Sequence, residues 1–263
     1  MKALVTGHKG FIGSNVVSRL RELQHECVCF DQEILEDESL LEKAVSEADV
    51  VLHIGAISDT SLQDEEQMLK HNYLFSKNLF KLCKQYDKKV IYSSSAATYG
   101  STGTPSNIYG WSKLLAEDIG AAICDKFVSL RYFNVYGPGE EHKGKMASVA
   151  YQSWKSNEVF KLFPKKPKRD FVYVKDIVSA NISAINAPPG IYEVGSGEAR
   201  TFEDVLENMK LEYEYHPESK IPDWYQFYTM SSEKNWIPFW KPQYNLEAGT
   251  KDYLEYLNEK SQS

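Results

Sequence analysis

The chain has 263 residues, of which 42% are hydrophobic and 25% charged, as in an ordinary globular protein. Its 30 lysines and arginines against 37 aspartates and glutamates give a net charge of -7, which disfavours general nucleic-acid binding. It contains no apolar run of membrane-spanning length and begins in a strand pattern, so we expect neither a membrane protein nor a secreted one. Cys27, Cys29, Cys83 and Cys124 have no disulfide-framework spacing, which indicates reduced thiols in a cytoplasmic protein.

Apolar strands alternate with amphipathic helices through the first half of the chain. Strands are predicted over residues 2–6, 27–30, 50–54, 90–92 and 127–132. A helix that opens near residue 11 has Ile12, Val16, Val17, Leu20 and Leu23 on its apolar face; others cover residues 68–83 and begin near residue 111. Because such strands form parallel sheets covered on both faces, we predict an α/β fold with a Rossmann-type, doubly wound parallel sheet.

The second half is broken by prolines from residue 138, and aromatic residues gather over residues 224–240. We expect a dinucleotide-binding Rossmann domain at 1–137 and a small α/β C-terminal lobe at 138–263 that mainly binds substrate. A strand and a helix near 171–187 are expected to return to the Rossmann sheet, and a last helix lies around 245–257. A further strand near 33–35 leaves too little chain for a full crossover, so we expect that sheet edge to be trimmed.

A glycine-rich turn carries the first functional signal. Gly7, Gly10 and Gly13 follow a strand and open a helix, and Asp31 ends the next strand. This context is the dinucleotide fingerprint, in which a pyrophosphate sits at the helix N-terminus and the acidic residue binds a ribose. Asp31 favours NAD, whereas Lys9 can reach the phosphate of NADP, so both cofactors stay open. The candidate cofactor-binding residues here are Gly7, Lys9, Gly10, Phe11, Ile12, Gly13 and Asp31.

Tyr109 and Lys113 are four residues apart, hence on one face of a helix. A nearby ammonium lowers the pKa of a phenol, so we expect Tyr109 to act as a base near neutral pH, and Lys113 can also hold the ribose hydroxyls of the cofactor. Ser93–Ser95 ends a strand at the carboxyl edge of the sheet, where α/β sites form. A hydroxyl there can hold the substrate oxygen that Tyr109 deprotonates.

Five motifs together carry a family resemblance. They are Thr6-Gly7-x-x-Gly10-x-x-Gly13, Ser94 to Gly100 (SSAATYG), Tyr109-x-x-x-Lys113, Arg131 to Pro138 (RYFNVYGP) and Arg169 to Asp176 (RDFVYVKD). With them the chain resembles the extended short-chain dehydrogenases/reductases, the NAD-dependent epimerase/dehydratase family. The resemblance implies Ser95, Tyr109 and Lys113 as catalytic residues; Gly55, Ala56, Asn72 and Val135 as further cofactor-binding residues; and Asn134 as a substrate-binding residue. It also implies a homodimer or higher homo-oligomer, paired through the helix that bears Tyr109 and its predecessor.

Residues 131–150 resemble one branch of that family, the ADP-L-glycero-D-manno-heptose 6-epimerases. That likeness implies Lys143 as a second acid/base that also contacts the sugar, and Arg169 and Tyr225 as substrate-binding residues. Arg169 belongs to a basic cluster with Lys161, Lys165, Lys166 and Lys168, a candidate seat for a substrate diphosphate. Three positions depart from the branch: Lys145, Gln152 and Trp224 stand where it has serine, histidine and arginine.

The function predicted from these residues is a nucleotide-sugar epimerase that uses bound NAD(P) to oxidise and re-reduce a sugar carbon, as in the ADP-heptose 6-epimerases. Alternatives are another NAD(P)-dependent nucleotide-sugar epimerase, a net reductase, a 4,6-dehydratase and a non-enzymatic dinucleotide-binding protein. Ala96 and Ala97 occupy the place of the acidic pair that a dehydratase normally carries. The histidines have no metal-ligand spacing, so no metal is expected.

Overall fold

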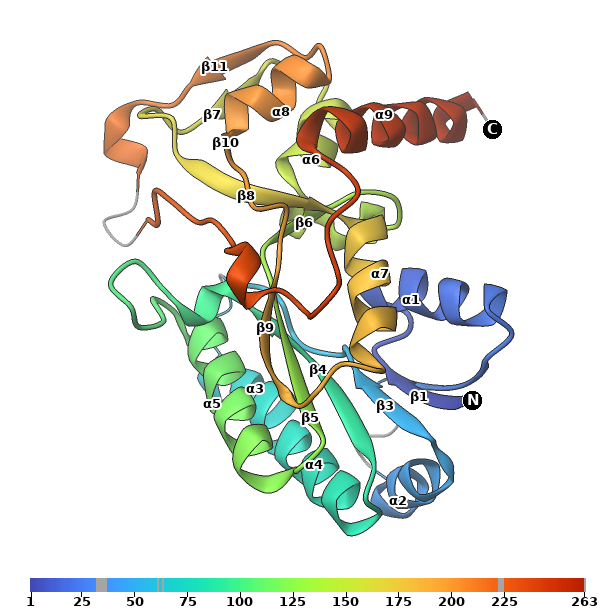
Figure 1. Ribbon diagram of the computed structural model, residues 1–263. Coiled ribbons are helices and arrows are strands. Elements are labelled where there is room, and N and C mark those ends of the chain that lie inside the picture. Colours follow the sequence, from blue (N-terminus) through green and yellow to red (C-terminus); the bar gives the residue numbers. More distant parts are fainter. Residues whose placement is uncertain (32–36, 61, 63, 222–224, 263) are drawn as a thin grey trace.

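The computed structural model describes residues 1–31, 37–60, 62, 64–221 and 225–262. At its centre lies a six-stranded sheet in the order β2-β1-β3-β4-β5-β9, with every neighbouring pair parallel (Figure 1). Its strands are β1 (Lys2–Thr6), β2 (Glu26–Phe30), β3 (Val50–His53), β4 (Lys89–Ser95), β5 (Phe127–Tyr132) and β9 (Gly190–Val194). The Rossmann-type parallel sheet expected from the sequence is confirmed.

Helices cover both faces of this sheet. On one face lie α1 (Phe11–Glu22) and α7 (Val174–Ala184), and on the other α2 (Glu38–Glu47), α4 (Phe75–Gln85) and α5 (Ile108–Ile123) (Figure 1). Successive side chains of a strand point to opposite faces, so Val5 packs with the first group and Leu4 with the second. Both residues are fully buried, which gives the strands their continuous apolar character.

The expected apolar face of α1 holds for Val16, Val17 and Leu20, which are buried. Leu23 is an exception: it follows the last helical residue, is 38% exposed, and closes the helix through its backbone N–H, which bonds to the Arg19 carbonyl. Periodicity assigned Leu23 to the buried face because it assumes that the helix continues. Beyond α1, β2 forms one edge of the sheet among the described residues. The strand expected near 33–35 lies outside them.

The C-terminal lobe contains two small sheets and three helices around a core of its own. The elements are β6 (Asn134–Tyr136), β7 (Phe160–Leu162), β8 (Lys168–Tyr173), β10 (Ala199–Thr201), β11 (Tyr213–Tyr215), α6 (Val149–Lys155), α8 (Phe202–Asn208) and α9 (Leu246–Gln262). One sheet has the order β10-β8-β6 and the other pairs β11 with β7. Short 3-10 helices occupy Ala96–Thr98, Glu141–Met146, Glu218–Lys220 and Glu233–Asn235.

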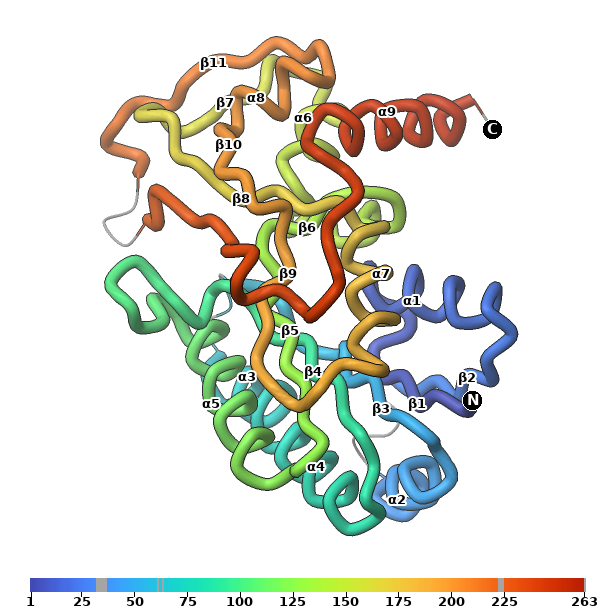
Figure 2. The backbone as a smooth tube through the Cα atoms, viewed as in Figure 1, coloured from blue at the N-terminus to red at the C-terminus, as the bar shows by residue number. Residues whose placement is uncertain are grey.

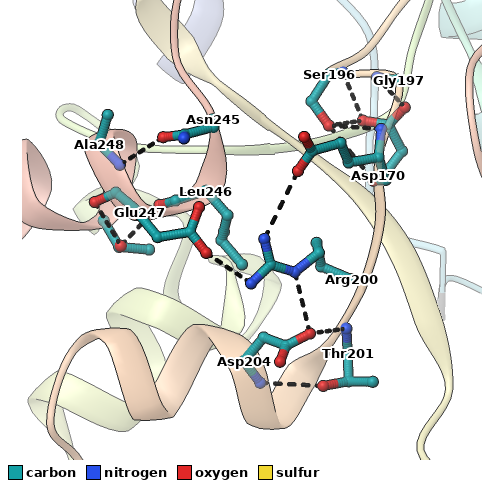
Figure 3. Close-up of polar contacts among 12 residues, drawn as sticks. Asp170, Ser196, Gly197, Arg200, Thr201, Asp204, Asn245, Leu246, Glu247 and Ala248 are labelled. Atoms are coloured by element: carbon teal, nitrogen blue, oxygen red, sulfur yellow. Dashed lines mark hydrogen bonds and ion pairs between the residues drawn. The ribbon is translucent and has the colours of Figure 1, made fainter.

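Two polar hubs fix the lobe (Figure 3). The buried carboxylate of Asp170 on β8 accepts hydrogen bonds from the backbone N–H groups of Ser196, Gly197 and Ser231 at 2.6–3.0 Å. Arg200 on β10 donates at 2.6 Å to Glu247 of α9 and at 3.3 Å to Asp204 of α8. These hydrogen bonds tie segments that are distant in sequence to strands β8 and β10.

The chain does not divide cleanly at residue 137. Helix α7 lies against α1, as expected for a helix near 171–187, and Ile177 belongs to the core of the central sheet. The strand next to it, β8, is in the lobe sheet, so the expectation that this strand returns to the central sheet is wrong. The returning strand is β9, which pairs with β5 through Val128–Gly190 to Tyr132–Val194 (Figure 2). The domain boundary itself stays a prediction.

Candidate active site

In and after the turn that follows β1, only glycine fits at positions where two backbone segments touch. Gly7 has a φ of +73°, and a Cβ there would lie 2.4 Å from the Cα of Gly55. A Cβ on Gly13 would lie 2.1 Å from the Gly7 carbonyl oxygen. Because no side chain intervenes, the backbones of the β1 and β3 ends and the start of α1 meet directly. A ligand can therefore approach the main chain closely here.

The start of α1 suits an anion. Its N-cap is Gly10, which supplies no side chain to cap the first backbone N–H groups. A neighbouring pocket is lined by Thr6, Gly7, Asp31, Gly55, Ala56, Ile57, His71 and Phe75. It brings the predicted residues Gly7, Asp31, Gly55 and Ala56 together from three strand ends. Open N–H groups beside a carboxylate fit a dinucleotide, with its pyrophosphate on the helix and its ribose on Asp31.

Asn72 lies behind this pocket. It belongs to a π-helical turn, Lys70–Leu74, between α3 (Glu65–Leu69) and α4, and it is 1% exposed. Its amide accepts from the Ile57 N–H at 2.8 Å, donates to the Ile57 carbonyl at 2.9 Å and donates to Ser112 at 3.1 Å. Asn72 thus holds Ile57, a wall of the pocket, and links it to the helix of Tyr109 and Lys113. Such π-turns are common at functional sites.

The structure brings Ser95 and Tyr109 together. Ser95 ends β4 and caps the 3-10 turn that follows, where its hydroxyl accepts from the Ala97 N–H at 3.1 Å. Tyr109 is half-buried in the first turn of α5, which Asn107 caps by accepting from the Gly110 N–H at 2.8 Å. The Ser95 hydroxyl hydrogen-bonds the phenol of Tyr109 and so opposes the rise that burial causes in its pKa.

Lys113 is 2% exposed, and its Nζ lies 4.4 Å from the centroid of the Tyr92 ring. Burial lowers the pKa of Lys113 to about 7, and the carboxylate of Glu117 one turn further along α5 opposes this. The expectation that Lys113 lowers the pKa of Tyr109 is wrong for this structure, because desolvation of the phenol raises that pKa. A half-neutral lysine also provides less positive charge to stabilise a phenolate.

A buried polar network extends from α5 toward the lobe. Glu117 is fully buried, pairs with the guanidinium of Arg131 and accepts from the Ser129 hydroxyl at 2.6 Å. Arg131 in turn lies over the ring of Tyr99, 4.7 Å from its centroid. Tyr99 follows the Ser95 turn and donates to Glu193 on β9. The network therefore connects α5, the turn that follows Ser95 and β9, which lies at an edge of the central sheet among the described residues.

A second group of predicted residues lies in the lobe. Arg169 is 7% exposed and sits between two aromatic rings, 5.1 Å from the Tyr225 centroid and 5.8 Å from that of Phe202. Burial lowers its pKa. Within the basic cluster, Lys165 pairs with Glu218 at 3.0 Å and Lys161 with Glu214 at 3.9 Å. The rings of Tyr225 and Phe202 hold the Arg169 guanidinium in a fixed orientation, which suits recognition of a phosphate.

Lys143 lies beside the glycine turn. Its Nζ is 5.6 Å from the centroid of Phe11, the first residue of α1. Burial lowers the pKa of Lys143, while the buried carboxylate of Glu140 opposes this. Glu140 is itself fixed by the Gly137 N–H at 3.1 Å and the Ser148 hydroxyl at 2.7 Å. On neighbouring β6, Asn134 is exposed and Val135 half-buried.

The profile of the NAD dependent epimerase/dehydratase family matches residues 3–195 of this chain. The chain belongs to this family. A relative, the ADP-L-glycero-D-manno-heptose-6-epimerase of Cupriavidus pinatubonensis, is 32% identical over 332 aligned positions that span 100% of both chains. The Helicobacter pylori ADP-L-glycero-D-manno-heptose-6-epimerase structure is 29% identical, with a TM-score of 0.84 over 98% of this chain and 96% of that one.

A UDP-glucose 4-epimerase of Thermus thermophilus, solved in complex with NAD, is 27% identical, with a TM-score of 0.82 over 98% of this chain and 99% of that one. Family, relatives and fold agree that the protein is an NAD-dependent nucleotide-sugar epimerase. The predictions of enzyme class and of NAD as a cofactor are confirmed. They also fit the glycine cradle at Gly7 and the carboxylate of Asp31.

Two departures from the heptose-epimerase pattern have structural explanations in this epimerase. The amide of Gln152 donates to the carbonyls of Lys145 at 3.1 Å and Ala147 at 2.5 Å, which ties α6 to the end of the 3-10 helix that carries Lys143. Lys145 is exposed. The third departure, Trp224, lies outside the described residues.

Sequence reasoning missed two residues of the site. His53 was considered only as a metal ligand, although it ends an otherwise apolar strand at the edge where site residues gather. Glu117 follows Lys113 at helical spacing, and a carboxylate one turn from a buried lysine is the signal that could have identified it.

Proposed function

We propose that this enzyme inverts a sugar carbon of an ADP-heptose-type nucleotide sugar, at C6. The observation that carries the proposal is the 32% identity to a heptose 6-epimerase over the whole of both chains. Lys143 supports it from its place beside Phe11, and Arg169 between two aromatic rings offers a seat for the diphosphate.

Ser95 and Tyr109 are proposed to act on the substrate hydroxyl. The Ser95 hydroxyl, which hydrogen-bonds Tyr109, is placed to hold the substrate oxygen while the phenol takes its proton. When bound, NAD would supply the reversible hydride acceptor that oxidation and re-reduction of the sugar carbon require, together with a positive charge. Lys113 is proposed to hold the ribose of the nicotinamide half, and Asp31 the ribose of the adenosine half. The pyrophosphate is proposed to lie against the turn residues Lys9, Gly10, Phe11, Ile12 and Gly13, with Val135 nearby.

Lys143 is proposed as the second acid/base. Inversion needs hydride to return to the opposite face of a transient carbonyl, so the sugar must present either face to the same cofactor. Two proton-transfer groups on different elements suit this, and Lys143 and Tyr109 come from the 3-10 helix at Glu141–Met146 and from α5. Burial lowers the pKa of Lys143, which favours proton exchange nearer neutral pH. Asn134 and Tyr225 complete the proposed sugar and diphosphate contacts.

Epimerisation of another nucleotide sugar is the second candidate. Gln152 favours this second candidate, because its amide donates hydrogen bonds to backbone carbonyls at the position where the heptose branch has a histidine near the sugar. Dehydration has less support: Ala96 and Ala97 form the turn after Ser95 and carry no acid group.

The test is incubation with ADP-D-glycero-D-manno-heptose without added NAD(P)H, followed by chromatographic resolution of the two C6 epimers. Appearance of the L-glycero epimer without net cofactor consumption supports the proposal, whereas stoichiometric loss of NAD(P)H identifies a reductase. No conversion by protein that binds NAD rules out this sugar and directs the assay to UDP-sugars.

We further infer a homodimer paired through α4 and α5. Leu74, Trp111 and Leu115 are large apolar residues beside or on these helices, and they are 50%, 42% and 41% exposed. Replacing Leu115 with glutamate is expected to yield monomers in light scattering. NAD is inferred to bind better than NADP, because the carboxylate of Asp31 repels a 2′-phosphate, with Lys9 the opposing charge.

A cytoplasmic location is inferred for the enzyme from its cysteines, which are all free thiols in the structure. Within the described ranges, no helix combines the length and apolarity needed to cross a bilayer.

A further inference from the structure

His53, the last residue of β3, is 1% exposed and hydrogen-bonded at both ring nitrogens. Its Nδ1 lies 2.7 Å from the Thr6 hydroxyl, and its Nε2 lies 2.7 Å from the Ser76 hydroxyl. The rings of Phe75, Phe80 and Tyr92 surround the imidazole at centroid distances of 5.5–6.0 Å. Neither the family motifs nor the proposed reaction gives this residue a role.

A chain of hydrogen bonds runs from Asn72 through Ser76, His53 and Thr6 to Gly55, and the direction of each bond follows from the protons available. The Ser76 hydroxyl donates to the Asn72 carbonyl at 2.7 Å, and it has a single proton. It must therefore accept from His53, whose proton is on Nε2. Burial lowers the pKa of His53 to about 3, so the ring is neutral and Nδ1 accepts from the Thr6 hydroxyl. The oxygen of that hydroxyl accepts from the Gly55 N–H at 3.3 Å.

This chain of hydrogen bonds joins three walls of the NAD pocket. Thr6 precedes Gly7 at the end of β1, and Gly55 lies across from Gly7 in the loop after β3. Asn72, at the other end, fixes Ile57 through both of its peptide groups. We propose that His53, as the neutral Nε2–H tautomer, is the positioning residue that holds the β1 end, the β3 loop and the π-turn in register for NAD.

Histidine suits this place because one neutral ring offers a donor and an acceptor on opposite sides. A protonated ring would donate at both nitrogens and could no longer accept the hydrogen bond that the Thr6 hydroxyl donates to Nδ1. It would also add a second cation near Lys113, whose Nζ packs on Tyr92, the ring next to His53. Among the described titratable neighbours, Lys113 disfavours an imidazolium through its charge, whereas burial raises the pKa of Tyr92 and keeps its phenol neutral.

The first test uses the native full-length protein labelled with 15N at histidine. We expect the nitrogen shifts of His53, assigned from their loss in a His53→Phe variant, to report an Nε2–H tautomer that does not titrate between about pH 5.5 and 8. An Nδ1–H tautomer, or titration in that range, overturns the proposal.

The second test measures NAD affinity by calorimetry in His53→Phe and Ser76→Ala, two residues that do not line the pocket. Each leaves a polar partner unmatched in the network, so we expect the Kd for NAD to rise about tenfold, with kcat at saturating NAD nearly unchanged. His25→Asn, in the turn between α1 and β2, is the matched control and should bind as the wild type does. If His53→Phe and Ser76→Ala lower the melting temperature but leave the Kd unchanged, His53 serves stability alone and the proposal fails.

Discussion

The phenolic hydroxyl of Tyr99 donates a 2.6 Å hydrogen bond to the carboxylate of Glu193. The same carboxylate accepts from the Ser232 N–H at 2.6 Å and from the Asn235 amide at 3.0 Å. Tyr99 follows the Ser95 turn, and Ser232 follows the segment that begins at Tyr225. One carboxylate therefore ties the loop after Ser95, the proposed catalytic serine, to the segment proposed to contact the substrate.

We expect Glu193→Gln to loosen this tie, because the amide replaces a charged acceptor that faces three donors. A lost or mismatched buried hydrogen bond costs about 1–3 kcal/mol. The KM for the nucleotide sugar should rise about tenfold, with a smaller change in kcat, and steady-state kinetics measures both. Glu198→Gln, at an exposed position between β9 and β10, is the control. An unchanged KM in Glu193→Gln would show that the tie has no part in substrate binding.

Replacing Tyr109 with phenylalanine removes the proposed proton acceptor and little else. General acid/base catalysis contributes about 10²- to 10⁴-fold, so kcat should fall by at least about two orders of magnitude. NAD binding, measured by calorimetry, should persist, because the glycine turn is untouched. Tyr86→Phe, which removes a phenol that donates to Glu42 at the half-buried C-cap of α4, should keep full activity. Turnover that survives in Tyr109→Phe would remove this phenol from the chemistry.

Lys143 and Lys145 form a matched pair in the 3-10 segment Glu141–Met146, one on each side of a kink at Gly144. Lys143 is partly buried beside Phe11, whereas Lys145 is exposed. We expect Lys143→Ala to lower kcat for epimerisation about 100-fold and Lys145→Ala to lower it less than twofold. Epimer formation followed by chromatography provides the measurement. Equal effects of the two changes would contradict a specific role for Lys143.

Arg169 should contribute chiefly to substrate affinity. A guanidinium held between rings makes charge-assisted hydrogen bonds of about 1.5–3 kcal/mol, so Arg169→Met should raise the Kd for the nucleoside diphosphate about 10- to 100-fold. Lys168→Met changes an exposed cation on the same strand and should have a small effect. Calorimetry with ADP compares the two. Similar losses in both variants would assign the binding to general positive charge.

Lys113 should make stability depend on pH in the cofactor-free protein. Its pKa falls from 10.5 to about 7 on folding, so between these values the unfolded chain binds a proton that the folded chain does not. Stability rises with pH wherever the unfolded state binds more protons. The free energy of unfolding of the wild type should therefore increase from about pH 7 toward pH 10 relative to Lys113→Met. Urea denaturation at pH 7 and pH 9.5 measures this, and parallel curves would contradict it.

The local patterns predicted the parts of this molecule that depend on local chemistry. The alternation of strands and helices predicted the parallel sheet, and the spacing of Gly7, Gly10 and Gly13 predicted the turn that a Cβ would block. The glycine positions are readable because backbone sterics dictate them. The same holds for Tyr109 and Lys113, which one helix places on one face.

Properties set by three-dimensional surroundings were not readable in this way. Spacing brought Lys113 near Tyr109 but gave no burial, so the direction of the pKa shift of Tyr109 was wrong. Asn72 stays a predicted cofactor-site residue, but its contacts with Ile57 and Ser112, which are distant in sequence, could not be read from its own segment. The assignment of β8 to the central sheet failed because strand pairing depends on topology, which a strand's own residues do not encode.

Strand β9 completes the central sheet although it lies far along the sequence, and this limits where the protein can be truncated. A fragment that ends at residue 137 would lack β9 and α7, so β5 would present a bare row of N–H and C=O groups. The apolar face that α7 covers, with Val5 and Leu20, would also meet water. Exposed edges and apolar faces of this kind drive self-association. We therefore expect the isolated N-terminal fragment to aggregate, whereas the intact chain folds as a single cooperative unit.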